Sequence, residues 1–359
     1  MIRVAHVISA TGTYGGERFV PALAHAQRAA GIDALVVTGC SRHDVVSLAR
    51  RLRALRPEIV HTHLAHAKHW GRLAALLTGV PHIVHTEHAN DFRSPLPLRL
   101  LSRFLHARTD RVVAFTQAQA QRIAKYERVP LDRIVIIPNG IDTDELESCR
   151  RDSARAALGI EPEICMILCV GRLDAVKRYD RALEALALLP QSANVHLFIA
   201  GDGRLREQIR RYASERGVAD RLHLLGYRND VPRLLSAADV VLNTSESEGM
   251  PLSLIEALCS GIPVVSTPWP GAGQFLAGSA RVTADSRPES IAATLQAALS
   301  DARQSTPLDD LRERFSIGRV AAKHASLYAE VLGREQAQHA SPTPSSVAPD
   351  GLPPLEPRY

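Results

Sequence analysis

Short apolar runs alternate with longer stretches of helical periodicity along nearly the whole chain. The runs are rich in Val, Ile and Leu and are too continuous for strands with one solvated face. They are typical of parallel strands that helices cover on both sides. The predicted strands are 4–8, 34–37, 58–60, 82–84, 111–115 and 133–137 in the first half, and 165–170, 195–200, 222–225, 240–242, 263–266 and 280–282 in the second.

Two sets of six strands favour two doubly wound α/β domains rather than a single barrel. The length of 359 residues fits about two domains. The predicted domains span 1–150 and 151–318, and the acidic, polar stretch 142–155 is expected to link them. A last helix at 319–335 is expected to pack back on the first domain. The Pro-, Ser- and Ala-rich tail 336–359 is predicted to be disordered, because it has too little apolar surface to bury.

Composition is typical of a soluble globular protein, with 45% hydrophobic and 23% charged residues. No apolar run approaches the roughly 18 residues of a membrane span. The first residues are read as strand rather than signal peptide. The five cysteines form no CxxC pair, which favours buried free thiols in a reducing compartment. A cytoplasmic location is therefore expected.

Charge is divided unevenly between the halves. Residues 1–150 hold 20 Lys and Arg against 13 Asp and Glu, a net charge of +7. Such a surface suits an anionic partner. Within it, 94–108 is basic and Leu-rich at helical spacing, so this helix either lies on an anionic membrane surface or packs on its own domain. Nucleic acid is not expected, because only 4% of residues are aromatic and no stacking platform is visible.

The most informative stretch follows the predicted strand 240–242. Glu248 lies on the loop after this strand, and Glu256 lies within the helix that the loop opens, with Pro251 suited to its first position. The amides of the helix's first turn would face an anion beyond the strand end. Two carboxylates around an anion cradle suit a nucleotide sugar, which has hydroxyls at both ends and phosphates between. The alternative is that both glutamates are solvated surface residues.

Other candidate residues also follow strand ends, where open α/β sheets bind ligands. Gly15 and Gly16 close a glycine-rich turn that lacks the GxGxxG spacing of dinucleotide-binding proteins. Arg172 and Lys177 follow strand 165–170 and could converge on a diphosphate. His88 ends a histidine-rich segment; a metal site is disfavoured there, because no HExxH pattern is present.

Together these residues resemble the family 4 retaining glycosyltransferases of GT-B fold, over roughly 1–335. In the second half the matching motifs are Val-Gly-Arg-Leu at 170–173 with Lys177, Ala-Gly-Asp-Gly at 200–203, the turn at Gly226, and Glu248-Gly-Met-Pro through Glu256-Ala-Leu. In the first half they are Gly-Gly-Glu at 15–17, His-Thr-His at 61–63, His88 and Ile-Pro-Asn-Gly-Ile-Asp at 137–142.

The resemblance implies two Rossmann-like domains facing a central cleft. It implies a retaining hexosyltransferase that needs no metal or other cofactor. The donor would be a nucleotide sugar, with UDP- and GDP-sugars favoured. The acceptor would be a saccharide or a lipid-linked molecule in the synthesis of cell-surface polysaccharide, lipopolysaccharide or glycolipid. Such an enzyme would be cytoplasmic, or peripheral on the inner face of the cytoplasmic membrane.

The resemblance also assigns roles to residues. Arg172 and Lys177 would hold the diphosphate, Glu256 the ribose, and Glu248 the hydroxyls of the donor sugar, with His88 beside the reacting sugar. The implied catalytic residues are Glu248, His88, Arg172 and Lys177. The implied donor-binding residues are Gly15, Gly16, Arg172, Lys177, Tyr227, Met250, Pro251, Leu252, Ser253 and Glu256, with no metal ligand.

Two features depart from this family or imitate another. Gln274 stands where the family has an acid, so the donor contacts of the loop 268–274 are in doubt. Asp142-Thr143-Asp144 imitates a metal-binding DxD motif but ends the Pro-Asn-Gly-Ile-Asp segment, and is discounted. The competing functions are a nucleotide-sugar hydrolase or epimerase with the same donor site, and a non-catalytic basic binding module.

Overall fold

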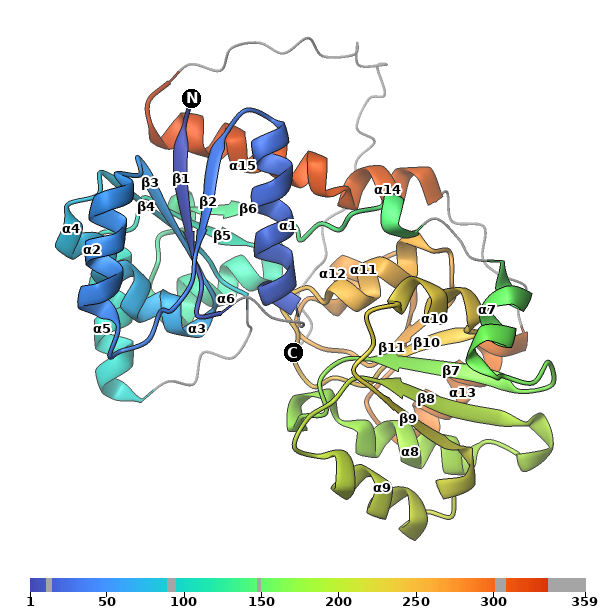
Figure 1. Ribbon diagram of the computed structural model, residues 1–359. Coiled ribbons are helices and arrows are strands. Elements are labelled where there is room, and N and C mark those ends of the chain that lie inside the picture. The colour runs from blue at the N-terminus through green and yellow to red at the C-terminus, as the bar shows by residue number, and fades with distance from the viewer. Residues whose placement is uncertain (11–14, 89–94, 147–149, 301–307, 335–359) are drawn as a thin grey trace, which may run out of the picture.

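Two α/β lobes lie side by side in the computed structural model, which describes residues 1–10, 15–88, 95–146, 150–300 and 308–334 (Figure 1). The predicted tail 336–359 and residues 12–14 of the glycine-rich turn lie outside these ranges. Within them, no helix has both the length and the apolar character needed to cross a membrane.

The first lobe is built on a parallel sheet with the strand order β2-β1-β3-β4-β5-β6. Strand order reverses between β1 and β3, the point at which doubly wound sheets open a crevice. The strands are β1 (Arg3–Val7), β2 (Asp33–Val37), β3 (Ile59–His63), β4 (His82–Thr86), β5 (Arg111–Ala114) and β6 (Ile134–Ile136).

The second lobe repeats this plan with the order β12-β11-β10-β7-β8-β9, and its strand order reverses between β7 and β10. All twelve predicted strands are present, and the prediction of two doubly wound domains is confirmed. The strands are β7 (Cys165–Val170), β8 (Val195–Ala200), β9 (Leu222–Gly226), β10 (Val240–Asn243), β11 (Val264–Ser266) and β12 (Arg281–Val282).

Helices cover both faces of each sheet, and short 3-10 or π turns join them. In the first lobe they are α1 (Gly15–Ala29), α2 (Val45–Leu55), α3 (Leu64–His66), η1 (Ala67–Gly71), α4 (Arg72–Thr78), α5 (Leu96–Ala107), α6 (Gln117–Glu127), η2 (Leu131–Arg133) and η3 (Asp144–Leu146). After it come α7 (Arg151–Leu158), η4 (Ala175–Lys177), α8 (Tyr179–Leu188), η5 (Gln191–Ala193), α9 (Arg206–Glu215), η6 (Ala219–Arg221), α10 (Val231–Ala237), α11 (Leu252–Cys259), α12 (Ala272–Leu276), α13 (Pro288–Ser300), α14 (Leu308–Phe315) and α15 (Ile317–Val331).

Strands β3 and β4 run further than their apolar patterns predict. Both continue through polar residues, ending at His63 and Thr86, and these side chains are buried. Apolar patterns alone stop at Val60 and Val84, because they count a histidine or threonine as an exposed position. Here the polar groups satisfy one another inside the domain, so the strands extend toward the candidate site.

The stretch expected to link the domains is partly helical. Residues 151–158 form α7, which packs against α10. Arg155 is buried there and donates to the backbone carbonyls of Ala237 and Glu161. These hydrogen bonds fasten the helix to the second domain.

The last helix, α15, runs along the first domain, where it packs against α1 (Figure 1). Its inward side chains, including Leu327 and Tyr328, join one apolar cluster with Val4, Ile8 and Leu23. The chain therefore crosses back from the second domain and completes the core of the first.

Truncating Leu327 should therefore destabilise the first domain. We expect Leu327→Ala to lower its free energy of unfolding by about 2–5 kcal/mol, the usual cost of a buried leucine. The chain has two tryptophans, Trp70 and Trp269, so urea unfolding in a Trp269→Phe background reports the first domain. Leu188→Ala, at a leucine that is 51% exposed, is the matched control. An unchanged Trp70 transition would contradict this packing.

Candidate active site

Lys177 and Glu248 meet at the point where the strand order of the second sheet reverses. Lys177 follows β7 and Glu248 follows β10, and these two strands are neighbours. Lys177 Nζ lies 2.6 Å from Glu248 Oε1. The Ser245 hydroxyl donates to the same oxygen at 2.6 Å. The topology thus brings together two predicted site residues that lie 71 positions apart.

Arg172 does not share this partner. Its guanidinium lies 3.6 Å from Asp174, and its side chain is 60% exposed. Asp174 also accepts from the amide of Val176 and so begins the short helix η4 that ends at Lys177. Each of the two cations thus has a different carboxylate beside it, and their convergence on a diphosphate stays a prediction.

Glu256 is buried within α11, and Arg18 of the first domain reaches it. Arg18 Nη1 lies 3.1 Å from Glu256 Oε1, and Glu145 is the second partner of Arg18 at 3.3 Å. Burial raises the pKa of Glu256 to about 7, although Arg18 favours the charged form. Pro251 is the N-cap of α11, so the helix begins at Leu252, one residue later than predicted.

His88 and Gly249 bring the backbones of the two domains close together. A Cβ atom at Gly249 would lie 2.3 Å from the backbone carbonyl oxygen of His88. On the other side of His88, a Cβ at Gly16 would lie 3.0 Å from its Nδ1 and 2.6 Å from Leu64 Cδ2. Two predicted motifs, at 15–17 and 248–251, therefore converge on the predicted residue His88.

Two further contacts across the domains were not predicted. Asn139 Nδ2 donates to the carbonyl of Met250 at 2.7 Å, which ties the Pro-Asn-Gly segment to the loop before α11. Gln274 accepts from the amide of Ala118 in the first domain, with 3.4 Å between nitrogen and oxygen. The residue that stands at 274 in place of the family's acid is thus a glutamine that contacts the first domain.

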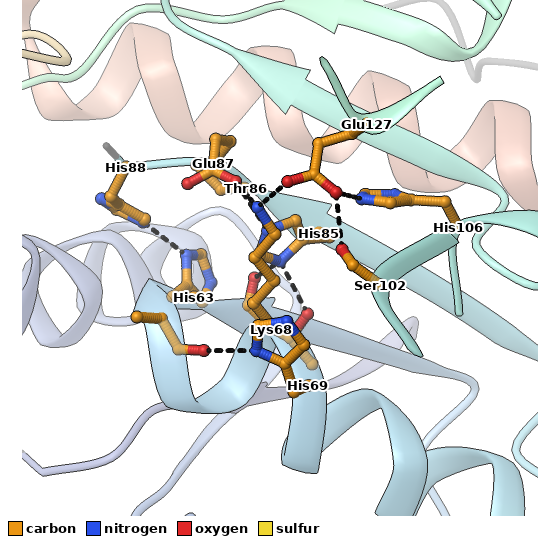
Figure 2. A network of polar contacts seen from close by, with 12 residues as sticks. His63, Lys68, His69, His85, Thr86, Glu87, His88, Ser102, His106 and Glu127 are labelled. Atoms are coloured by element: carbon orange, nitrogen blue, oxygen red, sulfur yellow. Dashed lines mark hydrogen bonds and ion pairs between the residues drawn. The ribbon is translucent and has the colours of Figure 1, made fainter. Parts of the chain in front are cut away.

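A buried ionic network holds the segment that carries His88 (Figure 2). Lys68 Nζ lies 2.6 Å from Glu87 and 2.8 Å from Glu127, and Ser102 donates to Glu127 at 2.7 Å. Burial lowers the pKa of Lys68, but the two carboxylates outweigh it and raise this pKa above its ordinary value. The network joins η1, the end of β4, α5 and α6, so it fixes the backbone just before His88.

The remaining predicted residues follow the ends of β1, β9 and β10. Gly15 begins α1 with a φ of 46°, which favours glycine. Met250 is buried, and Leu252 and Ser253 are half-buried in the first turn of α11. Tyr227 follows β9 and is 46% exposed. None of these positions reveals a ligand contact by itself.

Helix α5 packs on its own domain, one of the two alternatives considered for 94–108, of which residue 94 lies outside the described ranges. Ser102, Leu105 and His106 point inward. Leu96, Leu100 and Phe104 form an exposed stripe at spacing of four residues on its other side. The helix thus packs on its own domain and still presents an apolar face, and contact with a membrane stays a prediction.

Comparisons with known proteins agree with this geometry. Residues 150–317 match the family described as glycosyl transferases group 1, and residues 41–145 match glycosyltransferase family 4. The chain belongs to the family 4, group 1 glycosyltransferases. The two matches cover the first lobe from residue 41 on and the second lobe, and they adjoin between β6 and α7.

One relative is the Escherichia coli enzyme named UDP-Gal:alpha-D-GlcNAc-diphosphoundecaprenol alpha-1,3-galactosyltransferase. The two sequences are 33% identical over a region that spans 62% of this chain and 60% of that enzyme. This chain is also 32% identical over 58% of its length to a D-inositol 3-phosphate glycosyltransferase of Mycolicibacterium gilvum, of which it covers 50%. The matched region thus spans about half to three-fifths of these relatives.

Solved structures support the fold. HepE from Anabaena, in complex with UDP and glucose, matches with a TM-score of 0.78 at 18% identity, over 92% of this chain and 100% of that one. WaaG, a glycosyltransferase of lipopolysaccharide biosynthesis, matches with a TM-score of 0.62 at 21% identity, over 92% and 98%. Together with the two parallel sheets, these likenesses confirm the predicted GT-B fold.

The pKa of Glu256 predicts an unusual pH dependence of stability. The folded chain binds this proton with a pKa of about 7, against an ordinary value of 4.5. Between these values the folded state holds more proton than the unfolded state, so the free energy of unfolding falls as pH rises. We expect Glu256→Gln to remove most of this fall, on the order of 2–3 kcal/mol.

Urea unfolding at pH 5 and pH 8 measures this effect. In a Trp70→Phe background, Trp269 reports the second domain. The control is Glu207→Gln, at a carboxylate whose side chain is 71% exposed. Equal slopes against pH for Glu256→Gln and the control would show that Glu256 does not bind its proton in the folded chain as inferred.

Proposed function

We propose that this chain is a retaining glycosyltransferase, which moves a sugar from a UDP- or GDP-sugar to a saccharide or lipid-linked acceptor during synthesis of a cell-surface glycan. The observation that carries the proposal is the pair of Lys177 and Glu248 at the strand-order reversal of the second sheet, 2.6 Å apart. Ligands of doubly wound sheets bind at this point.

The second domain offers groups for each part of a nucleotide sugar. Lys177 and the exposed Arg172 are the cations for the diphosphate, and the amides at the start of α11 add partial positive charge. Glu256 is the proposed ligand of the ribose hydroxyls. Glu248 would then accept from hydroxyls of the donor sugar, at the side of the site that faces His88.

The chemistry follows from charge that develops on the leaving group. When the bond between the sugar and the diphosphate breaks, negative charge grows on the departing phosphate oxygen. Lys177, Arg172 and the α11 amides stabilise that charge more in the transition state than in the ground state, and this difference accelerates the reaction. The first domain, through His88, would exclude water that otherwise hydrolyses the donor.

Relatives support the classes of donor and acceptor. The matched Escherichia coli galactosyltransferase is named for a UDP-sugar donor and a lipid-diphosphate acceptor, and HepE binds UDP and glucose. If the acceptor is lipid-linked, the exposed stripe of α5 would approach the membrane. A cytoplasmic site on the inner membrane face is accordingly part of this proposal.

Metal independence is also proposed. Lys177 and Arg172 would neutralise the diphosphate in place of a metal. In the DxD-like pair, the Asp142 carboxylate accepts a local hydrogen bond from the amide of Asp144 at 3.1 Å. Retention of configuration is proposed through attack on the same face of the sugar, with a phosphate oxygen taking the acceptor's proton.

Removing the Lys177 ammonium should cost much of the rate. We expect Lys177→Ala to lower kcat by about 10²–10³, as loss of one preorganised charge at a developing oxyanion does. Turnover is measured with a panel of UDP- and GDP-sugars in the presence of short saccharide or lipid-diphosphate acceptors. Lys125→Ala, at an exposed lysine of the first domain, is the control. Wild-type turnover in Lys177→Ala would refute the site assignment.

Two properties of the wild-type reaction test the remaining parts of the proposal. We expect turnover to be unchanged in excess EDTA, because protein cations neutralise the diphosphate. We also expect NMR of the product to show the donor's anomeric configuration. Activity that EDTA abolishes and Mg²⁺ or Mn²⁺ restores would refute metal independence, and an inverted product would refute retention.

A further inference from the structure

A row of hydrogen-bonded side chains runs through the first domain and ends at His88. Gln27 Oε1 lies 2.7 Å from His6 Nε2, and His6 Nδ1 lies 2.9 Å from His63 Nε2. His63 Nδ1 in turn lies 3.1 Å from His88 Nε2, the contact drawn in Figure 2. Gln27, His6 and His63 are completely buried. We call these four residues the histidine row.

The sheet itself creates this row. His6 on β1 and His61 on β3 are partners in register, and His63 follows two residues later on the same face. His63 is the register partner of Thr86, two residues before His88. Gln27 reaches the row from α1, which covers this face. The row therefore joins two parallel strands and a helix to the candidate active site.

The row has a direction. Burial lowers the pKa of both His6 and His88 to about 4, and lowers that of His63 well below its ordinary value, so all three are neutral at pH 7. A neutral imidazole has one donor and one acceptor nitrogen. The carbonyl oxygen of Gln27 accepts from His6 Nε2. It follows that His63 Nε2 donates to His6, and that His88 Nε2 donates to His63.

The other end of Gln27 agrees with this direction. Its Nε2 donates to the Tyr328 hydroxyl at 3.4 Å, and that hydroxyl lies 2.7 Å from His61 Nδ1. With the amide in this orientation, both of its groups have partners. Reversing the row would require the amide to turn over, and Tyr328 would then donate to it.

We propose that Gln27, His6 and His63 are positioning residues that hold the His88 proton on Nε2, so that Nδ1 presents a lone pair to a hydroxyl group of the sugar substrates. His88 Nδ1 faces Gly16, 3.0 Å from where a Cβ would stand. A side chain at position 16 would therefore cover this nitrogen. The role of this lone pair rests on the proposed glycosyltransferase function, whereas the position of the proton does not.

Two other uses of the row fit less well. His6, His61 and His63 are close enough to be considered as metal ligands, with nitrogens within 4.8 Å of one another. However, all six of their ring nitrogens already have hydrogen-bond partners. Two histidines on one zinc ion would also hold their nitrogens roughly 3.3 Å apart, rather than 2.9 Å. Proton conduction is disfavoured because the row ends in an amide, which does not titrate.

NMR of the protein labelled with ¹⁵N-histidine measures the proton position directly. At pH 7, long-range ¹H–¹⁵N correlations distinguish a protonated from an unprotonated ring nitrogen, and a His88→Asn variant identifies the His88 signals. We expect the wild type to carry the proton on Nε2. In Gln27→Met we expect the ratio of the two tautomers to fall roughly tenfold, the effect of losing one buried hydrogen bond.

The control is His223→Gln, which removes a half-buried imidazole of the second domain and should leave the His88 tautomer unchanged. A wild-type His88 with its proton on Nδ1 would overturn the proposal without any variant. So would a Gln27→Met protein with the wild-type tautomer. Zinc that remains bound after dialysis and is lost in His6→Gln would favour the metal site instead.

Kinetics separate positioning from a general structural effect. We expect Gln27→Met to lower kcat/KM for the nucleotide sugar roughly tenfold. Calorimetry should show unchanged affinity for UDP or GDP, because the second domain holds the nucleotide. Equal losses in both measurements would mean that Gln27 only supports the fold. If the wild type turns over no nucleotide sugar, the proposed function fails, while the NMR result still decides the proton position.

Discussion

The site depends on one close backbone contact, between the carbonyl of His88 and Gly249. A Cβ at position 249 would stand 2.3 Å from that oxygen, so the two sheet edges approach this closely only because residue 249 is glycine. The contact sets the distance between the site residues of the first domain and those of the second. Lys177 and Glu248 lie on one side of it, and His88 lies on the other. Arg18 and Asn139 reinforce it through Glu256 and Met250.

The charged groups buried around this contact are explained better by function than by stability. Glu256 is 6% exposed, and its raised pKa shows that the folded chain holds its carboxylate at a cost. The Lys68 network carries a similar cost, which three charged groups and Ser102 offset together. Apolar residues of similar volume often replace buried ion pairs in proteins without loss of stability, so stability alone does not require charge at these two places. Their polar character is explained if Glu256 binds a ligand and if Lys68 fixes the backbone that carries His88.

Much of this arrangement was predictable from local sequence. The strands, their parallel direction and the residues at their ends follow from apolar patterns and glycine-rich turns, and this placed Lys177, Glu248 and His88 at strand ends. That the two domains face a central cleft was implied by the family resemblance. The partners of these residues were not predictable. Arg18 lies 238 positions from Glu256, and Asn139 lies 111 from Met250. No spacing encodes such pairs, because they depend on how two separately folded domains meet.

The buried histidines show why polar strand residues were misread. In the His-Thr-His segment of β3, His61 and His63 point to the α1 and α15 face, and Thr62 points to the other, where it lies 3.0 Å from His85. Alternation of this kind usually means one solvated face. Here both faces are covered, so each polar group must find a partner inside the domain. The hydrogen-bond partners of His63 are His6 and, at the candidate site, His88. The need to pair buried polar groups thereby determines which His88 nitrogen the candidate site presents.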